Sequence, residues 1–261
     1  MSAAKRWADQ LAGWAIPQAI LDQAPVSPWG FPPKLFATHQ PHQASHAGDS
    51  ASIKRALEAL GDGGTVLDVG VGAGAGSLPL AGSATHITGV DESTSMLDAF
   101  DRAAADAGIG HDTIAGRWPD VAGSAPRADV VTCFHVLYNA SDLPSFARAL
   151  AEHAGSRVIT ELTAVHPQTA LGPLWKHFWN LERPTGPRAE DALEVLREAS
   201  LDPQLERFER TRPLGRGRSD LLEFVRRRLC LTPDRDPEID ALLGDEPVFS
   251  PPEVATLWWD V

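Results

Sequence analysis

The sequence has only two cysteines, Cys133 and Cys230, and they lie far apart, so nothing suggests a disulfide framework. No apolar run approaches the roughly 18–20 residues of a membrane-spanning helix, and none near the N-terminus resembles a signal peptide. Positive charge is also scarce: the formal net charge is -12, a field that repels phosphate backbones and disfavours broad nucleic-acid binding. These absences predict a soluble cytoplasmic protein.

What is present is enough apolar material for a globular core. Hydrophobic residues make up 43% of the 261 residues and charged residues 22%, which is too little charge for a disordered chain. Residues 4–23 carry apolar side chains at near-helical spacing, and residues 24–49 are rich in Pro, Gly and His. We therefore expect an N-terminal helical lid at 1–49 and a main domain at 50–261, with an insertion around 166–188.

From Thr65 onward, short apolar strands alternate with helical patterns. This alternation is typical of parallel βαβ units and predicts an α/β fold with a doubly wound, mostly parallel seven-stranded sheet. The expected strands are Thr65–Val69, His86–Val90, Thr113–Ala115, Val130–Phe134, Arg157–Thr160, Leu205–Thr211 and Val254–Trp259. The expected helices are 51–60, Ser77–Ala81, Ser93–Ala107, Leu143–His153, Ala189–Ala199 and Ser219–Leu229.

The strongest motif is the glycine-rich turn at residues 68–74, between the first expected strand and the next expected helix. Gly70, Gly72 and Gly74 lack Cβ atoms, so a ligand can approach the backbone closely. In an open parallel sheet, the crevice beyond the carboxyl ends of the strands is the ligand site. Asp91 ends the second expected strand, where a carboxylate can accept hydrogen bonds from ribose hydroxyls.

The glycine spacing alone does not name the cofactor. Residues 70–75 with Asp91 also fit a loose NAD fingerprint, Gly-x-Gly-x-x-Ala, so an NAD-dependent oxidoreductase is one alternative. Asp68 argues against it, because a carboxylate two residues before the first glycine would repel a pyrophosphate. The same carboxylate would suit a cationic ammonium or sulfonium group.

Four segments together resemble the class I S-adenosylmethionine-dependent methyltransferases: 66–74, 89–93, 95–97 and 128–131. The resemblance covers roughly residues 50–165 and is specific for cofactor and fold, but hardly for substrate. It implies S-adenosylmethionine as the cofactor and methyl transfer to an O, N or C atom of a small-molecule acceptor.

The resemblance also implies which residues hold the cofactor. The glycine loop and Asp68 would surround its methionine part, Asp91 would bind its ribose, and Glu92 and Met96 would line its adenine. The cofactor-binding residues that we expect in all are Asp68, Gly70, Gly72, Gly74, Asp91, Glu92, Met96, Arg117, Trp118 and Phe134.

The chain departs from the family after the third expected strand. Where the family often has an acidic residue that contacts the adenine amine, this sequence has Gly116-Arg117-Trp118-Pro119. Trp118 could stack on or edge the adenine, with Arg117 supplying its backbone, or Trp118 could simply pack against a helix.

The segment after the fourth expected strand, residues 133–139, should lie beside the sulfonium in this fold. Methyl transfer is an in-line displacement that depends mostly on alignment and exclusion of water, and a base is needed only if the acceptor loses a proton. His135 is the candidate base, because histidine titrates near neutral pH. Tyr138, the one tyrosine of the chain, is a second catalytic candidate. A structural role for His135 is the alternative.

Two charged patterns have competing interpretations. His39, His42 and His46 have a spacing that could suit zinc in a helix, but Pro41 lies among them, so we expect no metal and favour a loop over the cofactor. Residues 207–228 hold eight arginines, which predict a solvated face paired with acidic residues. The alternative is a site for an acidic substrate, a partner protein or RNA, the last as in an RNA-associated methyltransferase-like binding protein.

An aromatic stripe marks the predicted insertion, with Trp175, Phe178 and Trp179 on one helical face. The stripe indicates either a helix that packs on the sheet edge or a cap that forms an apolar acceptor pocket. Neither the acceptor nor the oligomeric state can be derived from the sequence.

Overall fold

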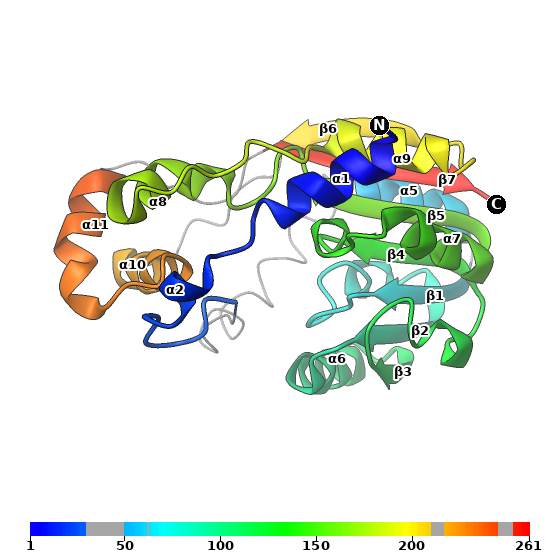
Figure 1. Ribbon diagram of the computed structural model, residues 1–261. Coiled ribbons are helices and arrows are strands. Elements are labelled where there is room, and N and C mark those ends of the chain that lie inside the picture. The colour runs from blue at the N-terminus through cyan, green and yellow to red at the C-terminus, as the bar shows by residue number, and fades with distance from the viewer. Residues whose placement is uncertain (30–49, 62, 210–216, 245–252) are drawn as a thin grey trace.

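A computed structural model shows a single seven-stranded sheet in the order β3-β2-β1-β4-β5-β7-β6 (Figure 1). All neighbouring strands pair in parallel except β7, which runs antiparallel to both β5 and β6. The predicted fold class is therefore confirmed. The strands are β1 Gly64–Val69, β2 Ala84–Asp91, β3 Gly110–Ala115, β4 Ala128–Phe134, β5 Ala154–Thr163, β6 Gln204–Glu209 and β7 Glu253–Asp260. The structure describes residues 1–29, 50–61, 63–209, 217–244 and 253–261.

Helices cover both faces of the sheet, because successive strand residues point to opposite faces. In β1, Val66 lies in the core beneath α5 and α6, whereas Leu67 lies in the core beneath α1, α7 and α9. The helices are α1 Ala3–Ala12, α2 Gln18–Leu21, α5 Ala51–Leu60, α6 Thr94–Asp106, α7 Leu143–His153, α8 Gly172–Trp179, α9 Ala189–Glu198, α10 Arg218–Arg228 and α11 Asp236–Leu243. No helix among the described residues has the length and apolar character needed to cross a membrane.

The first helix belongs to the body of the sheet. Trp7 of α1 is fully buried, its Nε1 donates a hydrogen bond of 2.8 Å to the carbonyl oxygen of Ala140, and its ring stacks on Tyr138. The backbone N–H of Ala3 donates to the carboxylate of Glu198 in α9. The beginning of the predicted lid segment is thus part of the main core, and residues 30–49 of that segment lie outside the described residues.

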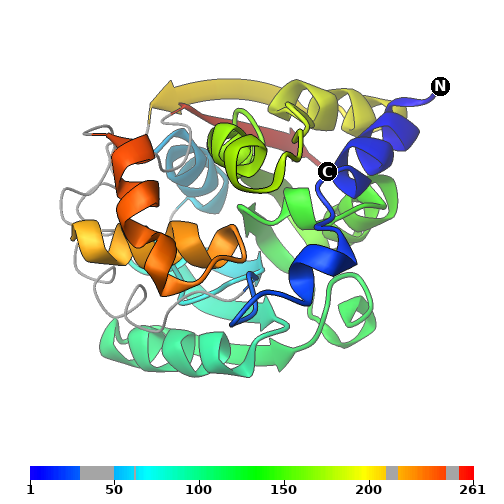
Figure 2. The same ribbon diagram turned by 60° about the vertical axis from the view of Figure 1, so that its left-hand side comes forward.

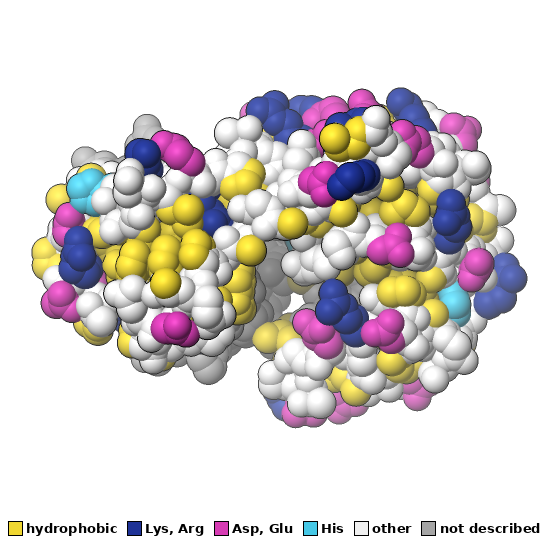
Figure 3. Space-filling model, in the orientation of Figure 1, with side chains coloured by type: hydrophobic (Ala, Val, Ile, Leu, Met, Phe, Trp, Pro, Cys, Tyr) yellow, Lys and Arg dark blue, Asp and Glu magenta, His cyan; other side chains and the backbone are white. Residues whose placement is uncertain are grey.

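Four helices form a separate body beside the sheet, which we call the helical cap: α2, α8, α10 and α11 (Figures 1 and 2). Its core is distinct from the two cores of the sheet and includes Ile20, Trp175, Val225 and Ile239. The aromatic stripe of α8 therefore packs within the cap. The sequence predicts helices in the regions of α8 and α10, but no helix was predicted in the region of α11. A notch separates the cap from the sheet in the space-filling view (Figure 3).

Aromatic rings and an arginine join the helical cap to the sheet. The ring of His166 lies 4.0 Å from that of Trp14 and 5.1 Å from that of Tyr138, between centroids. The guanidinium of Arg183 lies over the rings of both Trp14 and Trp175. Burial lowers the pKa of His166 to about 3, and the positive charge of Arg183 acts in the same direction. The imidazole at this junction is therefore neutral at physiological pH.

One expected helix is much shorter than predicted. After the glycine loop the chain forms only a 3-10 turn, Leu78–Leu80, where a helix over Ser77–Ala81 was expected. Pro79 lies within this turn and Gly82 follows it, and both residues disfavour further helix. In contrast, β5 extends three residues beyond the expected end of the strand at Thr160, to Thr163.

The neutral His166 makes stability depend on pH. An unfolded histidine takes up a proton near pH 6.5, whereas folded His166 resists protonation until about pH 3. The stability that its neutral form contributes is therefore full above about pH 6.5 and is lost as the pH falls, by up to about 1.4 kcal/mol per pH unit. We expect His166→Phe, which keeps a ring in the stack, to remove this part of the acid destabilisation in urea unfolding.

The control is His86→Gln, which changes a histidine on the surface of the sheet. It should leave the acid destabilisation in place. If His166→Phe and His86→Gln unfolded with the same pH dependence as the unaltered protein, the neutral state of His166 would not be the cause.

Candidate functional site

The glycine loop lies directly against the segment that follows β4. Gly70, with φ of 76°, donates its N–H to the carbonyl oxygen of Val90 at the end of β2. A Cβ at Gly70 would lie 2.2 Å from the side chain of Val136, and one at Gly76 would lie 2.8 Å from that of Phe134. Only glycine allows this close approach. The structure therefore brings together the glycine loop and the predicted catalytic segment.

Asp91 ties the glycine loop to the start of α6. One carboxylate oxygen accepts the backbone N–H of Gly72 at 2.9 Å, and the other accepts that of Ser93 at 2.8 Å. An ionised carboxylate has about four acceptor positions, so Asp91 can still accept hydrogen bonds from a ligand hydroxyl. A Cβ at Gly72 would meet no atom within 4 Å, which leaves this part of the loop open.

Asp68 is a buried carboxyl group at the end of β1. Its Oδ1 accepts a hydrogen bond of 2.9 Å from the hydroxyl of Thr132. Its Oδ2, and also the hydroxyl of Ser77, have no hydrogen-bond partner among the described residues. Burial raises the pKa of Asp68 to about 6, the nearby hydroxyls of Ser77 and Thr132 oppose this change, and the charge of Asp91 adds to it. Such orphaned buried polar atoms indicate a missing ligand or water.

The other predicted cofactor residues have different environments. Gly74 faces the core, because a Cβ there would lie 2.6 Å from Leu78. Phe134 is partly buried where β4 ends. Glu92 is exposed and Met96 is half-buried at the beginning of α6, directly after Asp91. Their predicted contact with adenine stays a prediction.

Trp118 packs against α7. Its indole is buried, its Nε1 donates a hydrogen bond of 3.3 Å to the carbonyl oxygen of Phe146, and its ring meets the edge of His153. The neighbouring Arg117 is exposed. This geometry favours the packing alternative over the expected adenine contact of Trp118, because both the ring and its polar atom are already engaged.

His135 lies one residue beyond the end of β4, and its side chain is 36% exposed. Its Nε2 lies 2.9 Å from Oε1 of Glu161, a residue of β5 that is 2% exposed. The sequence analysis missed Glu161. The signal was available, since Glu161 is a lone charged residue in the otherwise uncharged run Val158–Thr163.

The side chain of Tyr138 is engaged in packing and in a hydrogen bond to the backbone. Its hydroxyl donates a hydrogen bond of 2.7 Å to the carbonyl oxygen of Thr163, and its ring lies between Trp7 and His166. Burial raises the pKa of Tyr138 well above its usual value. This geometry does not favour the predicted catalytic role, because the hydroxyl is committed to the backbone and its ionisation is suppressed.

The arginines of the 207–228 segment that the structure describes are largely engaged with neighbouring groups. Arg218 binds Asp240 and Arg226 binds Asp236, each at 2.5 Å, which joins α10 to α11. Arg228 donates to the carbonyl oxygen of Pro28. These contacts favour the paired-face interpretation over an RNA surface. Three arginines of this segment and the three histidines of the other charged pattern lie outside the described residues: Arg210, Arg212, Arg216, His39, His42 and His46.

Metal-binding geometry is not found in the described part of the chain, where no three His, Cys, Asp or Glu side chains gather closely enough to hold an ion.

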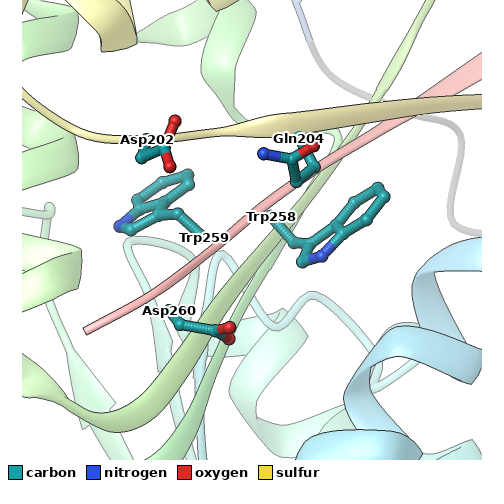
Figure 4. A pocket seen from close by; sticks show the side chains of 5 residues that line it. All are labelled: Asp202, Gln204, Trp258, Trp259 and Asp260. Carbon is teal, nitrogen blue, oxygen red and sulfur yellow. The ribbon is translucent and has the colours of Figure 1, made fainter.

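A surface hollow lies over β6 and β7, away from the glycine loop (Figure 4). Asp260 in this hollow binds Arg157 at 2.6 Å, near the amino end of β5. The hollow thus lies near the amino ends of the parallel strands, whereas the glycine loop lies at their carboxyl ends. Its lining residues are Asp202, Gln204, Trp258, Trp259 and Asp260.

Comparisons with known proteins indicate a methyltransferase domain. Residues 66–156 match the family described as methyltransferase domain. The cyclopropane-fatty-acyl-phospholipid synthase-like protein from Lactobacillus casei superposes with a TM-score of 0.59 at 17% identity, covering 94% of this chain and 98% of that one. The magnesium protoporphyrin IX methyltransferase from Synechocystis, with bound SAH (S-adenosylhomocysteine), gives 0.53 at 17% identity, covering 84% and 82%. No curated protein matches the sequence.

The strand order separates this fold from the NAD-binding alternative. A dinucleotide-binding sheet has the parallel order 3-2-1-4-5-6, whereas here the antiparallel β7 is inserted between β5 and β6. The structural likeness at these low identities establishes the fold, and the family match covers the glycine loop, Asp91 and β4. Residues 66–156 thus match a methyltransferase domain, and the sheet has the fold of the S-adenosylmethionine-dependent methyltransferases.

Proposed function

We propose that the chain binds S-adenosylmethionine beside the glycine loop, on the open side of Gly72 and next to Asp68 and Asp91, and transfers its methyl group to a small-molecule acceptor. The observation that carries this proposal is the buried carboxyl group of Asp68, whose Oδ2 has no hydrogen-bond partner among the described residues. An unpaired buried carboxylate is costly, so a cationic ligand would stabilise it.

The residues around the crevice fit this cofactor. The open side of Gly72 leaves room for a ligand against the backbone. Asp68 would face a positive charge, and Asp91 would accept hydrogen bonds from the ribose while it holds the loop. When bound, S-adenosylmethionine supplies an electrophilic methyl group on a sulfonium.

Asp68 should make cofactor affinity depend on pH. With a pKa of about 6, the carboxyl group is neutral in acid and charged at neutral pH, and only the charged form attracts a cation. We expect affinity for S-adenosylmethionine, measured by calorimetry, to rise as the pH rises through about 6 and then to level off. Asp68→Asn should bind about tenfold or more weakly at neutral pH and lose this dependence.

The same titration with S-adenosylhomocysteine identifies the cationic group, because this product has the ammonium but not the sulfonium. Equal loss for both ligands in Asp68→Asn would place the ammonium at Asp68. The control is Asp112→Asn, an exposed carboxylate paired with His86, which should bind as the unaltered protein does. Wild-type binding that was independent of pH would contradict this role of Asp68.

Gly72 offers a sharper steric test. Gly72 and Gly108 both have positive φ, 53° and 69°, and a Cβ would meet no atom within 4 Å at either position. Each glycine-to-alanine change should therefore cost about 1 kcal/mol of stability from backbone strain alone. Only Gly72→Ala places a methyl group in the proposed cofactor crevice. We expect a large loss of S-adenosylmethionine affinity in Gly72→Ala, with affinity unchanged in Gly108→Ala.

Thermal unfolding of both variants checks that their folds are equally intact. Equal cofactor affinity in the two variants would place the cofactor away from Gly72.

A further inference from the structure

Arg183 lies at the junction between the helical cap and the sheet, in the segment between α8 and α9. The central carbon of its guanidinium lies 5.1 Å from the ring centroid of Trp14 and 5.0 Å from that of Trp175. Its Nη1 donates a hydrogen bond of 3.1 Å to the carbonyl oxygen of Ala15, and its Nη2 donates to that of Trp14. Indole faces and backbone carbonyls attract a cation, but they carry no net negative charge to neutralise it.

The guanidinium of Arg183 has no carboxylate partner among the described residues. Burial lowers the pKa of Arg183, and no acidic side chain acts in the opposite direction. Arg235 of the helical cap provides a contrast, because it lies over the ring of Phe178 and also pairs with Glu238 at 2.7 Å. Charges withdrawn from water are ordinarily paired, since their desolvation is costly. The junction therefore lacks an anion.

Two hydrogen-bond donors at the junction also lack a partner. The Nε of Arg183 and the Nε1 of the fully buried Trp175 are shielded from water, and neither has an acceptor among the described residues. They cannot satisfy each other, because guanidinium and indole N–H groups only donate. The hydroxyl of Thr169, which follows His166 closely, is unpartnered as well. Orphaned donors of this kind indicate an absent group that accepts hydrogen bonds.

The junction lies at the same edge of the sheet as the glycine loop. His166 follows the carboxyl end of β5 at Thr163, and the glycine loop follows the carboxyl end of β1. In an open parallel sheet, this edge holds the ligands. In the strand order β2-β1-β4-β5, β4 separates the end of β5 from the ends of β1 and β2, where Asp68 and Asp91 lie. A group bound at the junction would thus be separate from the proposed cofactor residues.

Direct contacts connect Arg183 to the segment after β4. The ring of Trp14, over which Arg183 lies, stacks on that of His166. The ring of His166 in turn meets that of Tyr138, which lies two residues after Val136. The side chain of Val136 packs against the glycine loop. The junction therefore adjoins the segment that is expected to lie beside the sulfonium of the cofactor.

We propose that the junction between the helical cap and the sheet binds a carboxylate of the methyl acceptor, with Arg183 as the specificity-determining residue. The proposal rests on the proposed methyltransferase function. A carboxylate is planar and accepts parallel hydrogen bonds from a guanidinium, so it would supply both the missing charge and the missing acceptors. This carboxylate anchors the acceptor, and the atom that receives the methyl group is a different one.

An ordered water is the alternative occupant of the junction. The Oε1 of Gln10, which lies beside Gly186, is an unpartnered acceptor in this region. A water could bridge it to the orphaned donors. A water carries no charge, however, and would leave the guanidinium of Arg183 without a counter-ion. The charge therefore favours an anion.

The test is a titration with benzoate and with benzamide, which has a similar shape but no charge. Nitrogen NMR of the isotope-labelled protein follows the indole N–H of Trp175, and Trp175→Phe identifies its resonance. We expect benzoate to shift this resonance and benzamide to leave it unchanged. Arg183→Gln should weaken benzoate binding by about tenfold or more, and Arg183→Lys by less, because lysine keeps the charge but not the planar fork.

Arg235→Gln is the matched control, because Arg235 also lies over an aromatic ring but already has a carboxylate partner. It should bind benzoate as the unaltered protein does. Calorimetric affinity for S-adenosylmethionine should be unchanged in the variants of Arg183 and Arg235. If Arg183→Gln does not fold, Arg183→Lys and the wild-type resonance of Trp175 carry the test.

A second experiment connects the site with methyl transfer. Transfer from tritiated S-adenosylmethionine is measured for salicylate against salicylamide and for anthranilate against anthranilamide. We expect a higher kcat/KM for the acid of each pair, through a lower KM, and loss of this preference in Arg183→Gln. If none of these compounds is methylated, the benzoate titration decides alone.

The contrary results distinguish the two proposals. An unshifted Trp175 resonance with benzoate, an equal shift with benzamide, or full benzoate affinity in Arg183→Gln would overturn the carboxylate site and leave an internal water there. Equal transfer to acids and amides, or preference for the amides, would overturn the role of the carboxylate in the acceptor. A wild-type protein that bound benzoate but not S-adenosylmethionine would instead overturn the proposed function.

Discussion

The site depends on a steric constraint between two segments of the chain. Gly70 and Gly76 leave no room for a Cβ, because Val136 and Phe134 occupy that space. The residues that follow β4 can therefore lie directly beside the loop that is proposed to hold the cofactor. The backbone N–H of Gly70 donates to the carbonyl oxygen of Val90, and that of Gly72 donates to the side-chain carboxylate of Asp91, so both hydrogen bonds hold the loop from the side of β2. The loop is positioned before any ligand arrives.

Local patterns in the sequence predict the parallel sheet well. The strand Val130–Phe134 and the amphipathic helix Leu143–His153 could be predicted because the pattern of apolar and polar residues within each segment is enough to indicate its structure. The glycine loop after the first strand and Asp91 at the end of the second strand could also be predicted, because glycine and aspartate at these positions are themselves the signal. The helix expected at Ser77–Ala81 was wrong, since Pro79 and the flanking glycines limit it to one turn.

Pairings between distant residues could not be predicted in this way. Glu161 meets His135 only because β4 and β5 are neighbours in register, and no spacing within one segment encodes that contact. Tyr138 and Trp118 look like site residues in the sequence, but α1 and α7 cover their rings. Aromatic side chains serve cores and ligand sites equally well, so their residue type alone does not decide between these roles.

The attachment of the helical cap has a consequence for the evolution of this chain. The last pair of the β6–β7 ladder joins Glu209 to Glu253, so the polypeptide leaves the sheet and returns to it at adjacent points. The pairing of β6 with β7 therefore constrains neither the length nor the fold of the segment between residues 209 and 253. Helices such as α10 and α11 can be exchanged or remodelled in such a hairpin without disturbing the central strands. A new specificity could arise there while the ancestral chemistry is inherited intact.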